Sequence, residues 1–229
     1  MKAMILAAGR GERMRPLTDS RPKPLLEVGG KPLIVWQIER LVAGGITELV
    51  INHAHLGQQI EAFLGDGRGY GARIAYSRED EALESAGGVI NALHLLGPSP
   101  FMIVSADIYV ECDYRRLAES AALLQDGTLA FLWLVANPEW HARGDFALAD
   151  GFLRLNGAAR LTYSNIGIFH PKFFAGIDPG TKYPLFPLFN RAIAAGMVKG
   201  AVLNAVWDNI GTPAQLSALD QALRNKVLS

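Results

Sequence analysis

Hydrophobic residues in the first half of the chain follow two alternating patterns. Short apolar runs predict buried strands at residues 2–6, 48–52, 72–77 and 101–105. Apolar side chains recur every three or four residues, and so predict helices, at 33–42, 58–64 and 86–95. Pro32 can begin the first of these helices, and Asp113 can cap a further one that runs to about residue 125. This alternation is typical of an α/β fold whose central sheet is mostly parallel.

The second half of the chain is less regular. We expect strands at 129–136, 161–169 and 200–206, and a helix at 185–195. Asp150-Gly151 lies between two apolar runs in 146–155, which is a strong hairpin signal. Thr212, Pro213 and Gln215 occupy the N-cap, N1 and N3 positions of a capping box that begins the last helix. Because the chain has no internal repeat or linker, we expect one domain over residues 1–229.

Composition narrows the class of protein. Among 229 residues, 22 Lys and Arg balance 22 Asp and Glu, so net charge predicts attraction to neither nucleic acid nor a membrane. Any anionic ligand must therefore be held by a local cluster of donors. Cys112 is the only cysteine, which excludes an intramolecular disulfide and a Cys-rich zinc site. The apolar N-terminal run is too short for a signal peptide, so we expect a cytoplasmic protein.

The stretch LAAGRGERMRPLTDSRPKPLLEVGGKPL, residues 6–33, has the composition of an anion-binding loop. Gly9 and Gly11 allow the backbone to approach a ligand closely, and successive amide N–H groups can surround an anion. Arg13 and Lys23 add charged donors suited to phosphate oxygens. A Walker A motif is absent, and the dinucleotide fingerprint fails because Met14 replaces its third glycine. The stretch follows the first predicted strand, at the sheet edge where α/β folds bind ligands.

The whole stretch resembles LAAGxGxRxxPLTxxxPKPLxxVxxxPL, the nucleotide-binding signature of the sugar-1-phosphate nucleotidyltransferases. The resemblance continues along most of the chain, through the segments ESAGG (84–88), SAD (105–107), NIG (165–167) and WDNIGT (207–212). It implies a Rossmann-like three-layer sandwich similar to the glycosyltransferase-A fold. It also implies a division of labour, in which residues 1–126 bind mainly the nucleotide and residues 127–229 bind mainly the sugar.

The resemblance also assigns roles to individual residues. It implies a nucleotide site formed by Leu6, Ala7, Gly9, Gly11, Glu12, Arg13, Lys23 and Gly88. It implies that Arg13, Lys23 and Asp107 are catalytic, and that Glu84, Asp145 and Asn165 bind the sugar substrate. Arg143 is a further candidate partner for an anionic group on that sugar. Without the family match, Asp145 reads as a loop charge and Asn165 as a turn residue.

We expect Mg²⁺ as the cofactor, with Asp107 and Asn209 as its ligands. Asp107 directly follows the predicted buried strand FMIVS, so its carboxylate would emerge at the sheet edge; the alternative is a turn or helix-cap aspartate. The family usually has aspartate where this chain has Asn209. Asp208 cannot substitute without a bulge, because neighbouring side chains on a strand face opposite ways. Asn209 therefore predicts weaker metal affinity than a carboxylate would give.

Within the family, the segments MKAMILAAGRGERMRPLT, VINHAHLGQQIEAFLGDG, LESAGGV and RGDF resemble members that transfer a uridylyl group from UTP to N-acetylmuramic acid 1-phosphate. The resemblance thus implies small-molecule partners, a nucleoside triphosphate and a sugar 1-phosphate. Two alternatives stay open. One is the same chemistry with glucose, mannose or heptose 1-phosphate and UTP, dTTP, GTP or CTP. The other is a non-catalytic sensor that binds nucleotide sugars, which Asn209 favours. The sequence does not decide between a monomer and a small homo-oligomer.

Overall fold

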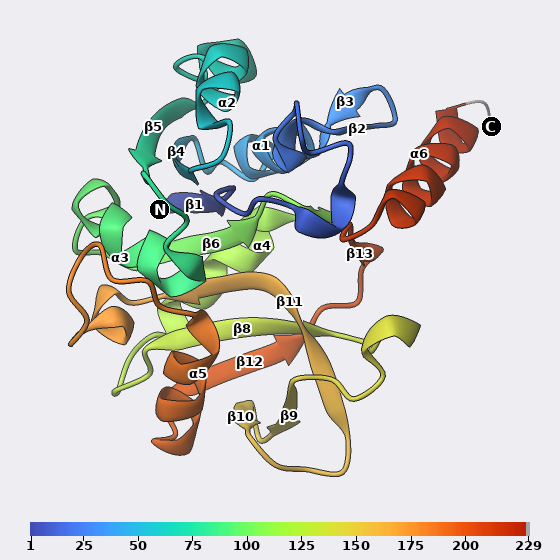
Figure 1. Cartoon of the computed structure of the whole chain (residues 1–229). Helices are drawn as coiled ribbons and strands as arrows, with labels where there is room; N and C mark the ends of the chain where they lie inside the picture. Colours follow the sequence, from blue (N-terminus) through green and yellow to red (C-terminus); the bar gives the residue numbers. More distant parts are fainter. Residues whose placement is uncertain (228–229) are drawn as a thin grey trace.

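The computed structural model describes residues 1–227, and a nine-stranded sheet forms its centre (Figure 1). Across the sheet the strand order is β5-β4-β1-β6-β11-β8-β12-β10-β9. In chain order the strands are β1 (Lys2–Leu6), β4 (Glu48–His53), β5 (Arg73–Arg78), β6 (Phe101–Ser105), β8 (Ala130–Val135), β9 (Phe146–Ala149), β10 (Phe152–Arg154), β11 (Arg160–Phe169) and β12 (Val198–Val202). The pairings make β10 and β11 run opposite to the other strands of this sheet, so the expected mostly parallel sheet is confirmed.

Helices cover both faces of the sheet and make three layers. The helices on the two faces are α1 (Leu33–Ala43), α2 (Gly57–Leu64), α3 (Glu84–Leu96), α4 (Tyr114–Glu119) and α5 (Leu185–Ala194), whereas α6 (Pro213–Val227) packs outside the sheet in a third apolar cluster. Helices α1, α2 and α4 share one apolar cluster with one face of the strands, whereas α3 and α5 share a second cluster with the other face. The two faces alternate along β1, because Ala3 and Ile5 lie in the first cluster and Met4 lies in the second. The three-layer sandwich is therefore confirmed.

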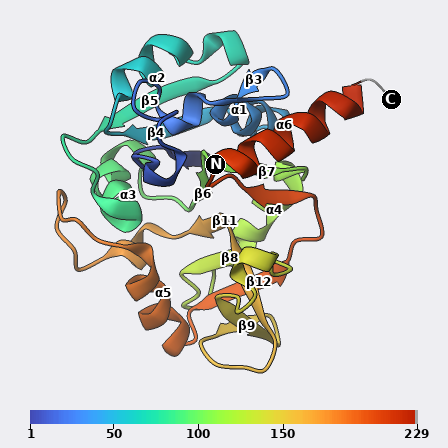
Figure 2. The ribbon, with the colours of Figure 1, turned by 45° about the vertical axis from the view of Figure 1, so that its right-hand side comes forward.

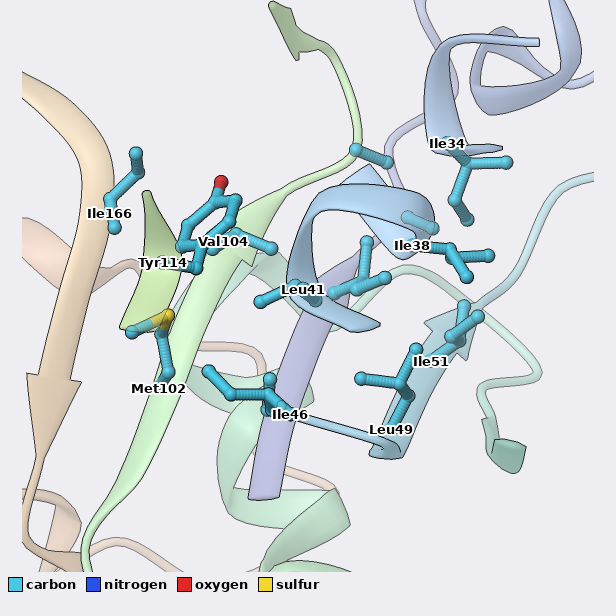
Figure 3. Close-up of a cluster of buried hydrophobic side chains, with 14 of the residues drawn as sticks. Ile34, Ile38, Leu41, Ile46, Leu49, Ile51, Met102, Val104, Tyr114 and Ile166 are labelled. Carbon is cyan, nitrogen blue, oxygen red and sulfur yellow. The ribbon is translucent and has the colours of Figure 1, made fainter. Parts of the chain in front are cut away.

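The first apolar cluster joins segments that are far apart in sequence (Figure 3). Ile34, Ile38 and Leu41 of α1 lie over Ile51 of β4 and Val104 of β6, as their helical spacing predicts. Each of these side chains is fully or almost fully buried, and such burial contributes about 1.5–3 kcal/mol per large apolar residue. This packing fixes where β1, β4 and β6 end, and therefore where the loops that follow them begin.

Two small sheets and several 3-10 turns surround the ends of these strands. The short strands β2 (Glu27–Val28) and β3 (Lys31–Pro32) form a hairpin before α1, and β7 (Ile108–Val110) pairs with β13 (Trp207–Asn209). The 3-10 turns are η1 (Glu12–Met14), η2 (Lys23–Leu25), η3 (Arg68–Tyr70), η4 (Ser120–Leu123), η5 (Glu139–His141) and η6 (Pro171–Phe174).

In both views α5 and β9 lie at the opposite end of the molecule from α1 and α2 (Figures 1 and 2).

Three expected boundaries were wrong. The helix after Asp113 ends at Glu119 and tightens into η4, although Asp113 does cap it by accepting a hydrogen bond from the backbone N–H of Arg115. Pro32 is the last residue of β3 and the N-cap of α1, not its first helical residue. The late strand covers Val198–Val202 because it pairs with β8, which itself ends at Val135.

No described helix is long and apolar enough to cross a membrane.

Candidate active site at the carboxyl ends of β1, β4 and β6

The opening loop follows β1 and wraps the edge of the parallel part of the sheet. Its glycine at position 11 has φ +71°, and a Cβ there would lie 3.0 Å from Thr18 Cγ2 and 3.2 Å from Lys23 Cβ. Thr18 Oγ1 donates to the carbonyl oxygen of Gly11 at 2.9 Å, and the ring of His55 contacts the Thr18 carbonyl at 3.1 Å. The loop is therefore fixed by a close turn that only glycine accommodates without strain.

A cavity of about 350 Å³ opens beside this loop, and we call it the main pocket. Its lining comes from the ends of β1, β4 and β6, the start of α3 and the loop before α5: Leu6, Ala7, Ala8, Gly9, Arg10, Lys23, Pro24, Asn52, Ala82, Glu84, Ser85, Ser105, Ala106, Asp107 and Lys182. Among the described residues, the backbone N–H groups of Ala8 and Gly9 have no hydrogen-bond acceptor. Unpaired N–H groups in a loop bind anions well, so this edge suits a phosphate.

Two smaller cavities extend the main pocket. One, of about 230 Å³, is lined by Gly9, Gly11, Glu12, Arg13, Lys23, Asp107 and Gly211. The other, of about 80 Å³, is lined by Leu6, Ser85, Ile103, Ser105, Tyr163, Asn165, Leu185, Phe186 and Phe189, and we call it the side cavity. Lys23 and Asp107 line both the main pocket and the first extension, whereas Leu6, Ser85 and Ser105 line both the main pocket and the side cavity. The three cavities thus form one continuous candidate site.

Lys23 and Asp107 form an ion pair at the centre of this site. The Nζ atom of Lys23 donates to Oδ2 of Asp107 at 2.5 Å, and the two side chains are 11% and 32% exposed. Lys23 begins the turn η2 between Pro22 and Pro24, and Asp107 lies between β6 and β7. The rigid turn and the sheet edge place a cation and a carboxylate side by side where a phosphate would enter.

A divalent metal fits the oxygen donors around Asp107. Asn209 lies opposite Ile108 in the β13–β7 pair, one residue from Asp107, and its buried Oδ1 has no hydrogen-bond partner among the described residues. The pairing of Asp208 with Tyr109 is regular, so no bulge brings Asp208 to the position of Asn209. The described residues contain no group of three or more His, Cys, Asp or Glu residues that could hold a metal. Mg²⁺ here would therefore need substrate and water oxygens to complete its shell.

A buried polar network supports the pocket from behind. The side chain of Asn52 accepts from the backbone N–H of Ala7 at 3.0 Å and donates to Glu79 Oε1 at 2.7 Å, while Glu79 Oε2 accepts from the N–H of Leu83 at 2.8 Å. A Cβ on Gly88 would lie 2.5 Å from Asn52 Nδ2 and 2.7 Å from Glu79 Oε1, so α3 approaches this network closely. Burial raises the pKa of the Glu79 carboxyl above its ordinary value. Gly88, expected in the nucleotide site, thus packs beside the Asn52–Glu79 pair.

The expected sugar-binding residues lie in different surroundings. Glu84 begins α3 with φ +64° and lines the main pocket. Asn165 lies at an irregularity in β11, where the register with β8 shifts between Tyr163 and Gly167, and it has φ +60° and lines the side cavity. The carboxylate of Asp145 contacts His141 Nε2 at 3.0 Å and accepts from the N–H of Tyr163 at 2.8 Å. Asp145 lines none of the three cavities; its contact with Tyr163 instead joins the start of β9 to β11, and its contact with His141 joins it to η5.

Sequence reasoning missed Lys182 and Glu79. Lys182 lies in the loop before α5, 75 residues after Asp107, the preceding residue that lines the main pocket, and the surrounding TKYP carries no recognisable motif. Glu79 follows β5 in an acidic run, and nothing in that run distinguishes it from Asp80 or Glu81. Long-range contacts place Lys182 at the pocket wall and Glu79 in the network behind the pocket, and a local pattern does not encode such contacts.

The same chain is similar to known proteins over nearly its full length. Residues 2–141 match the nucleotidyl transferase family. The N-acetylmuramate alpha-1-phosphate uridylyltransferase of Neisseria meningitidis serogroup B is 49% identical, covering 94% of this chain and 95% of that protein. The enzyme of the same description from Caulobacter vibrioides is 38% identical, covering 94% of each. A Bacillus anthracis crystal structure, described as a glucose-1-phosphate thymidylyltransferase, has a TM-score of 0.86 at 21% identity and covers 98% of this chain and 96% of that one. The chain therefore belongs to the nucleotidyl transferase family.

Proposed function

We propose that this protein transfers a uridylyl group from UTP to N-acetylmuramic acid 1-phosphate, giving UDP-N-acetylmuramic acid and pyrophosphate. Two relatives that carry this activity in their description align with 94% of the chain. The observation that carries the proposal is the Lys23–Asp107 pair, which lines both the main pocket and its extension beside Arg13. The Lys23 ammonium can neutralise phosphate charge, and the Asp107 carboxylate can hold a metal ion. Both functions suit a reaction that transfers a nucleotidyl group between two phosphates.

The reaction is a single displacement. A phosphate oxygen of the sugar 1-phosphate forms a bond to the α-phosphorus of UTP, the bond from that phosphorus to the bridging oxygen breaks, and pyrophosphate leaves with the electron pair. The attacking oxygen is already an anion at neutral pH, so the protein needs no strong general base. Catalysis then consists mainly of aligning two anions that repel each other and of neutralising charge during the transfer.

The nucleotide is assigned to the first half of the chain. In this proposal the unpaired N–H groups of Ala8 and Gly9 donate to the triphosphate, and Arg13 adds a charged donor. Lys23 lies between the main pocket and the extension, so its ammonium can stay with the phosphate oxygens as charge moves to the leaving group.

Enzymes of this family typically use a divalent metal, and we propose Mg²⁺ held by Asp107, with Asn209 as a second oxygen donor. When bound, Mg²⁺ would neutralise phosphate charge and orient the reacting groups. Asp107 then has two partners, because its carboxylate also accepts the hydrogen bond from Lys23. A neutral amide oxygen attracts the ion less than a carboxylate does, so we expect this site to need more free Mg²⁺ than one with two carboxylates.

The sugar is assigned to the junction of the two halves. Glu84 lines the main pocket and Asn165 lines the side cavity. The two cavities meet at Ser85 and Ser105. Their side chains can accept or donate hydrogen bonds to sugar hydroxyls and the acetamido group. Asp145 supports this region by holding β9 and β11 together, a positioning role that does not require contact with the sugar.

The test is Mg²⁺-dependent pyrophosphate release over a matrix of nucleoside triphosphates and sugar 1-phosphates, with Asp107→Asn beside the native protein. We expect the fastest release with UTP and N-acetylmuramic acid 1-phosphate, and loss of release in the variant. Fast release with another pair would keep the chemistry and replace the substrates. Nucleotide binding with no release for any pair would overturn the proposal and favour a non-catalytic sensor.

A further inference from the structure

Three cations line the main pocket, and two of them have carboxylate partners. The guanidinium of Arg10 contacts Glu12 at 3.1 Å, and the ammonium of Lys23 contacts Asp107 at 2.5 Å. Lys182 is exposed and has no hydrogen-bond or ion-pair partner among the described residues. An ammonium group in a pocket for phosphates, with no protein carboxylate to neutralise it, is available to an anionic ligand.

The backbone that carries Lys182 is fixed to the start of α3. The N–H of Tyr183 donates to the Leu83 carbonyl at 2.9 Å, and the Tyr183 carbonyl accepts from the N–H groups of Ala86 and Gly87 at 3.0 and 2.9 Å. A Cβ on Gly87 would lie 2.3 Å from the carbonyl oxygen of Thr181, so this approach requires glycine at position 87. The backbone at position 182 is thus held at the pocket wall, and the Lys182 side chain is exposed.

The attachment point lies where the main pocket meets the side cavity. The hydroxyl of Ser85 accepts from the N–H of Leu185 at 3.1 Å, and Ser85 lines both cavities. Lys182 lines the main pocket three residues before Leu185, which lines the side cavity. Arg143, the cation expected from the sequence to meet an anionic sugar group, lines none of the three cavities described above.

We propose that Lys182 binds an oxyanion of the acceptor sugar and so determines which sugar phosphates the protein accepts. This inference rests on the proposed function, because it takes the occupant of the junction to be the sugar 1-phosphate. Two oxyanions of N-acetylmuramic acid 1-phosphate have the required chemistry, its lactyl carboxylate and its phosphate. Either forms a charge-assisted hydrogen bond with an ammonium group, and a sugar that lacks the carboxylate separates the two.

The experiment is calorimetric binding of three ligands, UTP, UDP-N-acetylglucosamine and UDP-N-acetylmuramic acid, to the native protein, Lys182→Met and Lys182→Arg. Lys172→Met is the matched control, since Lys172 is an exposed lysine of η6 that lines none of the three cavities. We expect Lys182→Met to weaken binding of UDP-N-acetylmuramic acid about tenfold, as loss of one charge-assisted hydrogen bond predicts. Lys182→Arg should restore most of it, and the control should bind like the native protein.

The pattern over the three ligands decides the outcome. A loss confined to UDP-N-acetylmuramic acid assigns Lys182 to the lactyl carboxylate. An equal loss for both sugar nucleotides, with UTP unchanged, assigns it to the sugar phosphate. Weaker binding of UTP as well, or no change for any ligand, overturns the inference. Because binding is measured without turnover, a native protein that binds the sugar nucleotides but releases no pyrophosphate would overturn the proposed function while leaving this inference standing.

Discussion

The two halves of the sheet reach the site in different ways. In the first half β1, β4, β5 and β6 are parallel neighbours, so their carboxyl ends meet at one edge and the loops that follow them share one pocket. In the second half β11 runs against both β6 and β8, and its register shifts between Tyr163 and Gly167. The second half therefore lines the pocket and the side cavity through this irregular part of β11, at Tyr163 and Asn165, and through the segment from Lys182 into α5.

Under the proposed function, the first half binds the phosphates, which are common to all substrates, and the second half binds the sugar, which varies. Parallel strands with buried, paired ends give a rigid edge, which suits the phosphates that every reaction of this kind must align. An antiparallel strand with a local irregularity can change one side chain while its pairing on either side is kept. We therefore expect changes in the first half to abolish transfer and changes in the second half to alter the choice of sugar.

The largest expected effect is at the rigid edge. Lys23→Met keeps most of the buried stem but removes the ammonium, and we expect kcat to fall about 10²–10³-fold, the usual cost of losing one preorganised donor to a transition state. Steady-state pyrophosphate release would measure this. Lys31→Met is the control, because Lys31 forms a surface ion pair with Glu39 away from the pocket. A fall in kcat of less than fivefold would remove Lys23 from the chemistry.

Substitutions at two glycines of the opening loop should have different effects, one on the stability of the fold and the other on binding of UTP. Gly11→Ala must adopt φ +71° and crowd Thr18 and Lys23, so we expect it to lower the free energy of unfolding by about 1–3 kcal/mol. A Cβ on Gly9 meets no atom within 4 Å, and Gly9 lines both the main pocket and its extension. Gly9→Ala should therefore keep the native melting temperature and raise the KM for UTP. Urea unfolding and kinetics on both variants test this pair, and equal melting temperatures would contradict it.

In the second half, Asn165→Gly should change acceptor use without cost to the fold. Asn165 has φ +60°, which glycine adopts freely, so the variant removes the amide and retains the backbone turn. We expect kcat/KM for the acceptor to fall about three- to tenfold, the cost of one hydrogen bond, with KM for UTP unchanged. A matching rise in the KM for UTP would show that the two halves do not divide the substrates as proposed.

The smallest expected effect lies outside the pocket, on the first half. Glu61 accepts hydrogen bonds from Arg78 and contacts His53 at 2.6 Å, and the Arg78 hydrogen bond is the main cause that lowers the pKa of Glu61 to about 2. A lowered carboxyl pKa stabilises the fold above the unfolded value, near 4.5, and the stabilisation is lost as pH falls toward 2. Glu61→Gln should lose about 1 kcal/mol at pH 7 and less at pH 3. Thermal unfolding at both pH values, with no change in kcat at pH 7, is the expected result.

Local patterns in the sequence predicted most elements of the fold. Asp150-Gly151 forms the expected hairpin turn, with φ +52° and +77°, because this dipeptide tolerates positive φ at both positions. The hairpin of β2 and β3 and the β7–β13 pair were not predicted, since strands of two or three residues have no measurable periodicity. The expected end of the late strand, residue 206, was also wrong. β12 ends at Val202 because its pairing partner β8 ends at Val135.

The candidate site divides in the same way. Residues of the contiguous opening motif line the main pocket and its extension, because their relative positions follow from one loop and the strand before it. Asp107 was placed correctly at a strand end by the burial pattern of FMIVS. Glu79 and Lys182 were not predicted, since each is positioned by a contact between distant segments: Glu79, behind the pocket, with Asn52, and the loop of Lys182 with α3.

The tether of the loop at position 182 also has a consequence for how such a protein can evolve. Every hydrogen bond between described residues that holds this loop to α3 uses main-chain atoms or the hydroxyl of Ser85, and none uses the side chain at 182. A mutation there changes the charge presented to the ligand while the contacts that maintain the fold persist. In the proposed role of Lys182, single substitutions at this position change substrate preference without the loss of stability that usually restricts such changes.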